Sequence, residues 1–506
     1  MGRLVLVPGK LGLADLRAHA DSSGEIRLPR GAMARVAGAA ALVRKIAAGD
    51  ERVYGVNTGF GSLARTTIPP RDVRELQRRL VLSHAAGTGP LLPDGIVRRV
   101  LLLKAASLAL GRSGVRPAVI EILLALHNAG IHPCVPAKGS VGASGDLAPL
   151  AHLACALIGV GKVRDRGRVV TARRALARAG IAPLVLEAKE GLALLNGTQV
   201  STALALDGLF LTERLMAAAL VAGALSVDAA LGSDAPFDAR ANAVRNQKGQ
   251  IAVARALRGL LAGSAIRKSH VECDRVQDPY SLRCQPQVMG ACLDMMRFAA
   301  DVLVREANGV SDNPVVLVET GEVLSAGNFH GEPVAMAADV LAIALAEIGA
   351  LAERRVALLT DARFSSLPPF LVAHGGLNSG FMIAQVTAAA LASENKVLAH
   401  PASVDSLPTS ANQEDHVSMA TFAARRLGEM ADNVAGIVAI ELLAAAQGID
   451  FRRPLRSSPP LMRAHALIRA RVRRWVRDRV FAPDLETIKR LVLDGAFLPF
   501  VPEALA

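Results

Sequence analysis

Apolar residues recur at the spacing of a helix face over most of this chain. The apolar segments are rich in alanine and leucine, and they run for longer than strands do. Several of them end at glycine, the residue that most often follows the last turn of a helix. This pattern predicts helices over residues 71–87, 96–111, 117–130, 200–232, 288–309, 334–359 and 420–448.

Strand signals are short and scattered by comparison. Residues 314–327, PVVLVETGEVLSAG, predict a small β-hairpin that turns at 319–322. No repeat period, low-complexity tract or long polar linker divides the chain. We therefore expect a mainly α protein, with a loop-rich N-terminal part followed by a long helical bundle. Helices longer than about twenty residues pack into multi-chain bundles more often than into compact monomers, which favours an oligomer.

The composition is notable for its scarcity of aromatic residues. A chain of 506 residues is long enough for several domains or for one large helical body. Apolar residues make up 51% of it but aromatic residues only 3%, so alanine, leucine and valine must form the core. Tyr54 and Tyr280 are the only tyrosines, which makes their positions informative.

The chain carries a formal net charge of +13, with 58 Lys and Arg against 45 Asp and Glu. A basic protein can bind nucleic acid or an anionic surface. The densest basic run, residues 452–479, has neither a nucleic-acid-binding motif nor interleaved stacking aromatics. We interpret it as a solvated helix face whose arginines pair with carboxylates of the chain or of a partner subunit. We expect no nucleic-acid partner.

The five cysteines are few for this length, odd in number and without the CxxC or Cys/His spacing of a metal site. They predict a reduced chain without disulfides and without a bound metal. The start lacks the apolar core and cleavage site of a signal peptide. The longest apolar helix candidate, residues 215–227, is too short to span a bilayer. We expect a soluble, cytoplasmic protein outside the membrane. The cysteines are Cys134, Cys155, Cys273, Cys284 and Cys292.

Polar segments that contain glycine lie between the predicted helices, where loops can carry chemistry. Both tyrosines of the chain fall within these segments, which core packing alone does not explain. The segments are residues 53–64, 82–89, 138–152, 194–199, 275–288, 309–316, 325–336 and 406–419.

The segment 138–152, KGSVGASGDLAPLAH, concentrates glycine and serine in one loop. It does not fit a phosphate cradle, because it lacks the Gly-Lys-Ser/Thr of a P-loop and no β-rich segment precedes it. A nucleophilic serine is not favoured either, since Ser144 lies outside a GxSxG elbow. Activation of Ser144 by a histidine distant in the sequence stays open.

A third possibility is that the loop reacts with itself. The amide nitrogen of Gly145 can attack the carbonyl carbon of Ala143 and close a five-membered ring. This needs a kinked backbone and no Cβ on the attacking residue, which glycine allows. Loss of one water from the ring and of the Ser144 hydroxyl as a second water leaves a conjugated methylidene group. That group is a strong electrophile made without a borrowed cofactor. Asp146 is placed to assist the proton transfers.

With this loop the chain resembles the aromatic amino acid ammonia-lyases, whose methylidene-imidazolone (MIO) group forms from Ala-Ser-Gly within GSxGASGDLAPL. The resemblance extends from PGKLGLADLRA at 8–18 to NQEDHVSM at 412–419 and the helices that follow. It implies a mainly α fold with a long central helical bundle of the fumarase/aspartase type. It also implies an N-terminal, MIO-bearing domain at 1–200 and a helical core domain with tetramerisation helices at 201–506.

The resemblance further implies a homotetramer whose active sites are shared between subunits. The substrate would be a small amino acid, and the MIO made from Ala143, Ser144 and Gly145 would replace any external organic cofactor. Among the branches of the family, the chain most resembles the one that acts on L-histidine. That branch releases ammonia to give trans-urocanate in histidine catabolism.

Such an elimination removes a weakly acidic β-hydrogen and expels a poor leaving group, the α-amine. Besides the electrophile it needs a base near the β-carbon and a clamp for the carboxylate. Arg283 is the clamp candidate, because guanidinium binds carboxylate through two parallel hydrogen bonds. In QDPYSLR, Asp278 can cap a helix that begins at Pro279. Tyr280 and Arg283 then lie on one face of that helix.

The two tyrosines are the acid–base residues by resemblance. Tyr54 lies among glycines, which suggests a mobile loop over a pocket, and it is the stronger candidate for the base that removes the β-hydrogen. A tyrosine is a poor base near neutral pH unless an electropositive setting lowers its pKa. The sequence leaves the division of roles between Tyr54 and Tyr280 open.

Several further pocket residues follow from the resemblance. Asn196 would hold and polarise the MIO, although it could instead contact the substrate amine or form a turn. Phe329 would pack against the MIO. Gln277 and Asn313 are pocket candidates with weaker support, and Asn313 could simply form a turn before Pro314.

His84 and Glu414 bear on the choice of substrate. By resemblance Ser83-His84 and Glu414 are typical of the histidine branch, whereas tyrosine- and phenylalanine-selective relatives tend to carry an amide in place of Glu414. Physically, Glu414 can accept the imidazole N–H, while a phenyl ring would leave that carboxylate unpaired in the pocket.

Two other functions compete with this interpretation. The nearer one is a tyrosine or phenylalanine ammonia-lyase, or an aminomutase, on the same scaffold. The other is a basic, non-catalytic binding protein that kept the fold and would bind nucleic acid with a steep salt dependence. The intact sequence from Ala143 to Gly145 and both tyrosines weigh against the second.

Overall fold

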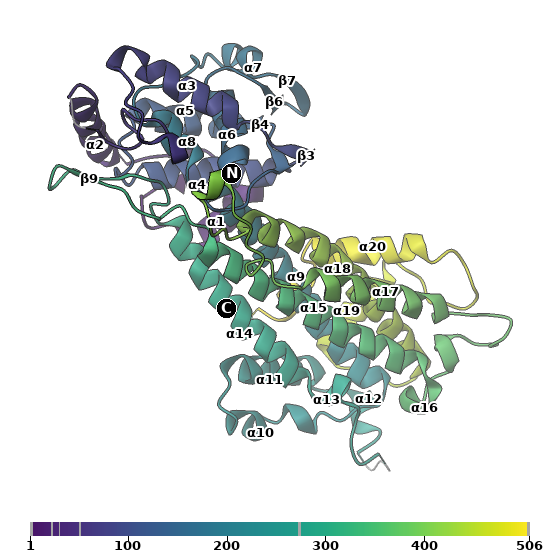
Figure 1. Cartoon of the computed structure of the whole chain (residues 1–506). Coiled ribbons are helices and arrows are strands. Elements are labelled where there is room, and N and C mark those ends of the chain that lie inside the picture. The colour runs from purple at the N-terminus through teal and green to yellow at the C-terminus, as the bar shows by residue number, and fades with distance from the viewer. Residues whose placement is uncertain (1–3, 22–23, 30, 50–51, 272–274, 503–506) are drawn as a thin grey trace. The chain divides into compact units, whose positions relative to one another are not determined.

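The computed structural model of the chain describes residues 4–21, 24–29, 31–49, 52–271 and 275–502. It is 59% helix and 7% strand. The strands of the described residues form four small sheets, each of two or three strands. The expected mainly α fold is therefore confirmed (Figure 1).

The helices that the apolar pattern predicts are all present. The hairpin is confirmed as well: strands β8 (Val315–Leu317) and β9 (Glu322–Leu324) are antiparallel, and Leu317 pairs with Glu322. The seven helices are α3 (Val73–His84), α4 (Asp94–Leu108), α5 (Pro117–Asn128), α9 (Gln199–Ala229), α14 (Gln285–Ala307), α15 (Glu332–Thr360) and α18 (Ala420–Phe451).

The chain divides into two compact units. The first comprises Met1–Asp207, Ala300–Asp339 and Pro401–Arg425, and the remaining segments form the second. The boundaries at 207, 299, 339 and 425 fall within helices α9, α14, α15 and α18. The expected organisation into domains 1–200 and 201–506 stays a prediction.

The first unit mixes helices with all of the strands. Beside α3, α4, α5 and the β8–β9 hairpin, it contains the parallel pair β1–β2, the antiparallel pair β3–β5 and the antiparallel sheet β4–β6–β7. Its other elements are β1 (Leu4–Val5), α1 (Leu13–Asp21), β2 (Ile26–Arg27), α2 (Ala32–Ala47), β3 (Thr88–Leu91), β4 (Ile131–Pro133), β5 (Pro136–Lys138), α6 (Leu147–Leu157), β6 (Lys162–Asp165), β7 (Arg168–Thr171), α7 (Ala172–Arg178) and α8 (Glu190–Leu195).

Helix α4 illustrates why this unit folds as it does. Its residues from Val100 to Leu108 are all buried, so the helix is apolar on every side and lies inside the unit, where it packs against α5. Lys104 is the one charged residue from Val100 to Leu108, and it is buried together with the leucines around it. Strand β5 and helix α6 hold the two ends of the glycine-rich loop at 139–146.

Among its described residues, the second unit contains helices and loops but no strand. Its core contains a buried ion pair in which Arg355 of α15 donates two hydrogen bonds to Glu441 of α18, with lengths of 2.5 and 2.8 Å. Ser226 of α9 donates a third to the same carboxylate at 2.7 Å. The shorter helices are α10 (Ala239–Ala243), α11 (Lys248–Leu261), α12 (Ala265–Lys268), α13 (Tyr280–Arg283), α16 (Ala362–Ser365), α17 (Met382–Leu398), α19 (Pro459–Arg469) and α20 (Ala482–Leu493).

Three helices correct the expectation that no segment is long enough to span a bilayer. By length and composition alone, α9, α15 and α18 could cross a membrane. The apolar candidate 215–227 is only part of α9, which has 31 residues. In these helices, 83%, 67% and 94% of the most apolar window is buried inside the protein. Their apolar surface is therefore largely used in protein packing.

Three arginines of the basic run at 452–479 pair with carboxylates of the same chain. Arg469 and Arg453 both contact Asp450, at 2.8 and 3.1 Å, and Arg479 contacts Asp484 at 2.7 Å. The interpretation that these arginines meet carboxylates of the same chain is confirmed for these pairs.

The cysteines that the structure describes are free. Burial raises the pKa of Cys155 to about 11 and that of Cys292 to about 12. Cys273 lies outside the described residues.

Candidate active site

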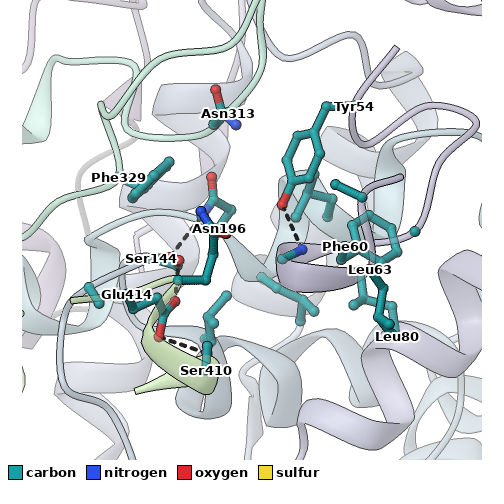
Figure 2. Close-up of a pocket in the computed structure, with 18 of the residues that line it drawn as sticks. Tyr54, Phe60, Leu63, Leu80, Ser144, Asn196, Asn313, Phe329, Ser410 and Glu414 are labelled. Atoms are coloured by element: carbon teal, nitrogen blue, oxygen red, sulfur yellow. Dashed lines mark hydrogen bonds between the residues drawn. The ribbon is translucent and has the colours of Figure 1, made fainter. Parts of the chain in front are cut away.

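A cavity of about 1360 Å³ lies in the first unit, lined entirely by residues of that unit. The structure brings together eight of the residues that the sequence proposed for the site, although they are far apart in the chain (Figure 2). They are Tyr54, His84, Ala143, Ser144, Asn196, Asn313, Phe329 and Glu414.

The glycine-rich loop turns at two positions that favour glycine. Gly142 and Gly145 have positive φ angles of 70° and 72°. A Cβ on Gly145 would lie 2.3 Å from the carbonyl oxygen of Gly197, and one on Gly142 would lie 2.3 Å from Oγ of Ser418. Only glycine fits either position. The loop is thus held in a kinked conformation with an attacking residue that has no side chain.

Asp146 anchors the end of this loop to the start of α9. Its backbone N–H donates to Gly197 O at 2.7 Å. Its buried carboxylate accepts from the backbone N–H groups of Val200 and Ser201, at 2.9 and 2.8 Å, and from the hydroxyl of Thr421 at 2.7 Å. Burial raises the pKa of this carboxyl group, although these hydrogen bonds oppose the rise. The geometry gives Asp146 an anchoring role.

Asn196 follows α8 and points its side chain at the loop. Its Nδ2 donates a hydrogen bond to Ser144 O at 2.7 Å (Figure 2). Its Oδ1 is buried and, among the described residues, has no partner. The carbonyl that Asn196 contacts would become part of the MIO ring, so the contact agrees with the polarising role expected for this residue.

Glu414 contacts the same loop from another side. Its Oε1 accepts a 2.5 Å hydrogen bond from the hydroxyl of Ser144. Its Oε2 accepts from the hydroxyls of Thr409 and Ser410 at 2.6 and 3.0 Å (Figure 2). Burial opposes ionisation of Glu414, but these three hydrogen bonds outweigh it and leave its pKa below the ordinary value. Glu414 is therefore a carboxylate at neutral pH.

Sequence reasoning missed Thr409 and Ser410. The only signal for them was their place in the polar segment 406–419, in which any hydroxyl was a candidate.

His84 is the last residue of α3 and is half-buried. Its Nδ1 lies 3.1 Å from Oγ of Ser83. Burial lowers the pKa of His84, while a backbone interaction with Leu80 and the charge of Glu414 oppose that effect. The ring is consequently neutral at neutral pH and lies close enough to Glu414 to be influenced by it.

Tyr54 reaches the cavity from a turn. Its hydroxyl accepts a hydrogen bond from the backbone N–H of Gly61 at 3.3 Å (Figure 2). Its ring meets Phe60 edge to face, with 6.3 Å between the ring centroids. Gly55 and Gly61 have positive φ angles, which accounts for the glycines around this tyrosine.

Phe329 and Asn313 are the two remaining proposed residues that line the cavity. Phe329 lines it and is half-buried. Asn313 also lines it, but its Oδ1 accepts a 2.6 Å hydrogen bond from the backbone N–H of Ala326. The Asn313 side chain thus holds the segment that leads to Phe329.

Gln277, Tyr280 and Arg283 belong to the second unit and do not line this cavity. The guanidinium of Arg283 lies 4.9 Å from the centroid of the Tyr280 ring. Its Nε is buried and has no hydrogen-bond partner among the described residues. Gln277 is exposed, and Tyr280 is 68% exposed.

The predicted cap of the helix that carries these residues is wrong. Helix α13 begins at Tyr280, and Pro279 precedes it. The carboxylate of Asp278 instead accepts from the backbone N–H of Ser233 at 2.6 Å and from Arg275 at 3.1 Å. One of these donors, Ser233, lies 45 residues from Asp278 in the sequence, where local reasoning does not reach.

Over the described residues, no three His, Cys, Asp or Glu side chains lie close enough together to hold a metal ion.

Comparisons with known proteins identify the family of this chain. The profile of the aromatic amino acid lyase family matches residues 11–470, and the chain belongs to that family. It is 63% identical to a protein named histidine ammonia-lyase from Rhodospirillum rubrum over 501 residues, which are 99% of this chain and 98% of that protein.

Solved structures show the same fold. The crystal structure of histidine ammonia-lyase from Trypanosoma cruzi superposes with a TM-score of 0.91 at 40% identity, over 99% of this chain and 96% of that one. A tyrosine aminomutase from Streptomyces globisporus gives a TM-score of 0.93 at 35% identity over 98% of both chains. Since one fold carries more than one reaction, the choice of substrate depends on the site.

Proposed function

We propose that this protein is a carbon–nitrogen lyase that eliminates ammonia from L-histidine to give trans-urocanate. The observation that carries the proposal is the position of Glu414, an ionised carboxylate at the loop Ala143–Gly145 and near His84. An imidazole offers an N–H to such a carboxylate, whereas a phenyl ring offers no hydrogen-bond donor at that place. The full-length similarity to histidine ammonia-lyases supports the same substrate.

The residues around the loop fit an MIO made from Ala143, Ser144 and Gly145. Support comes from the positive φ of Gly145, from the space that only glycine fits, and from the donor that Asn196 aims at Ser144 O. The MIO supplies an electrophile for the α-amine. No external organic cofactor is then required.

The other residues bind the substrate and move its proton. Glu414 accepts the imidazole N–H and fixes the ring, with His84 beside it. The phenolic oxygen of Tyr54 takes the β-hydrogen as a proton, and the electrons of that C–H bond form the double bond as the C–N bond breaks. Arg283 holds the substrate carboxylate through its guanidinium, and Tyr280 is the second acid–base residue.

We also propose that the active enzyme is a cytoplasmic homotetramer whose sites draw on more than one subunit. The cavity of about 1360 Å³ in the first unit exceeds the roughly 300–1000 Å³ of small-molecule sites. Histidine cannot fill it alone, so further side chains are needed to complete it. A partner subunit that supplies Tyr280 and Arg283 meets this need.

The test is to offer the purified protein L-histidine, L-tyrosine and L-phenylalanine separately and to follow ammonia release and the ultraviolet absorbance of the conjugated acid. Turnover of histidine alone is the expected result. Turnover of tyrosine or phenylalanine instead would keep the MIO chemistry but contradict the role of Glu414. No turnover, together with a chain mass that has lost no water, would contradict the whole proposal.

A further inference from the structure

Lys104 is buried in the first unit behind the proposed active site, and none of the proposed steps uses it. The residue lies in α4 and is 1% exposed. Its Nζ donates to two backbone carbonyl oxygens, Ala193 O at 3.0 Å and Asn196 O at 2.8 Å. Both carbonyls belong to the C-terminal end of α8 and the residue that follows it.

A lysine in this position is unusual because it has no direct carboxylate partner among its hydrogen bonds. The other buried lysine of this region, Lys189, forms an ion pair with Asp312 at 2.7 Å. Burial lowers the pKa of Lys104 to about 7, against the charges of Asp312 and Asp146. A protein keeps such a costly group where its donors are needed, since a leucine in its place would bury no charge.

The groups that need these donors are carbonyls at the C-terminal end of α8. The last carbonyl groups of a helix have no partner within the helix, and a buried one must find a donor elsewhere. Lys104 supplies donors to two such carbonyls at once. It thereby fixes the peptide of Asn196, whose side chain donates to Ser144 O at 2.7 Å. The next carbonyl, that of Gly197, accepts from the N–H of Asp146.

We propose that Lys104 is a positioning residue for MIO formation and for catalysis. It holds the backbone of Asn196 so that the amide of that residue stays aimed at the Ser144 carbonyl, and so that Gly197 stays against Gly145. This inference rests on the proposed function, because it assigns Lys104 to the maturation of the group that the function requires.

The test uses the full-length protein with the substitutions Lys104→Met and Lys104→Arg. Methionine has a similar length but no donor, whereas arginine keeps the charge and several donors. Leu123→Ala in α5 is the matched control, since it opens a cavity in the helix that packs against α4 but removes no hydrogen-bond donor. Intact mass measures the fraction of chains that have lost two waters, and ultraviolet absorbance measures the conjugated ring.

We expect wild-type protein and Leu123→Ala to lose both waters, although Leu123→Ala lowers the melting temperature. We expect Lys104→Met to leave a large fraction unprocessed. In its processed fraction, kcat should fall about 10- to 100-fold with a smaller change in KM, because a misplaced group affects the reacting geometry more than binding. Lys104→Arg should restore both the mass and kcat.

Three outcomes would overturn the inference: Lys104→Met with the wild-type mass and kcat, Lys104→Arg no better than Lys104→Met, or Leu123→Ala as poorly processed as Lys104→Met. Where Lys104→Met yields no soluble protein, Lys104→Gln takes its place, since one amide donor can satisfy one of the two carbonyls and should give intermediate processing. Wild-type protein that loses no water would instead refute the proposed function.

Discussion

Replacing Glu414 by glutamine tests the proposed choice of substrate at a single atom. The carboxylate accepts hydrogen bonds from Ser144, Thr409 and Ser410, and we propose that it accepts the imidazole N–H of histidine. Glu414→Gln keeps the size of the side chain but removes its charge. A hydrogen bond to a charged group contributes about 1.5–3 kcal/mol, and one between neutral groups contributes about 1 kcal/mol.

The difference of about 0.5–2 kcal/mol corresponds to a roughly 2- to 30-fold loss in kcat/KM for L-histidine. Phenylalanine has no N–H to offer, so loss of the charge removes a desolvation penalty for that substrate. We therefore expect the ratio of kcat/KM for histidine to that for phenylalanine to fall at least as far.

The assay is steady-state kinetics with both amino acids, on protein whose intact mass shows that both waters have been lost. Asp405→Asn is the control, since it removes an exposed charge that does not line the cavity. It should leave the ratio unchanged. A ratio for Glu414→Gln within about twofold of wild type would refute the imidazole role of Glu414.

Three further predictions test other parts of the structure. Gly145→Ala places a Cβ 2.3 Å from Gly197 O at a residue with a positive φ, so it should destabilise the loop by about 2–4 kcal/mol. Its intact mass should then show no loss of water, and a chain that has lost two waters would contradict this. Tyr54→Phe should lower kcat about 10²- to 10⁴-fold in steady-state assays without altering the processed mass, whereas wild-type turnover would exclude Tyr54 as the base. Arg355→Met leaves Glu441 buried and unpaired, and should lower the free energy of unfolding by about 3–5 kcal/mol in urea titrations; a loss under about 1 kcal/mol would show that water or another donor replaces the arginine.

The long helices and the hairpin could be predicted because their apolar residues keep one period over many positions. The same period predicted α9 over 200–232, but the uninterrupted apolar run that was compared with the width of a bilayer covered only part of that helix. Asp207, Glu213 and Arg214 interrupt its apolar run, so the apolar candidate began only at 215, although the helix starts at Gln199. Charged residues end an apolar run without ending a helix, since they need only one exposed side or a partner.

Some residues of the candidate site could also be predicted from the sequence, and others could not. Ser144, Asn196 and Glu414 could be proposed because each carries a motif or a distinctive residue type, and they lie together in the structure. The hydroxyls that hold Glu414 could not, because serine and threonine are common in loops. Lys104 left a stronger signal, a single charge in the apolar segment LLLKAASL, whose meaning depends on carbonyls some ninety residues away.

The hydrogen bond between Ser144 and Glu414 has a consequence for any preparation of this protein. The hydroxyl of Ser144 donates a hydrogen bond to Oε1 of Glu414. In an unprocessed chain, the Ser144 hydroxyl therefore already binds the Glu414 oxygen that we assign to the imidazole N–H. Loss of that hydroxyl as water vacates the oxygen. A mixed preparation would then bind free imidazole with a stoichiometry below one per site, so the shortfall would count the immature chains independently of turnover.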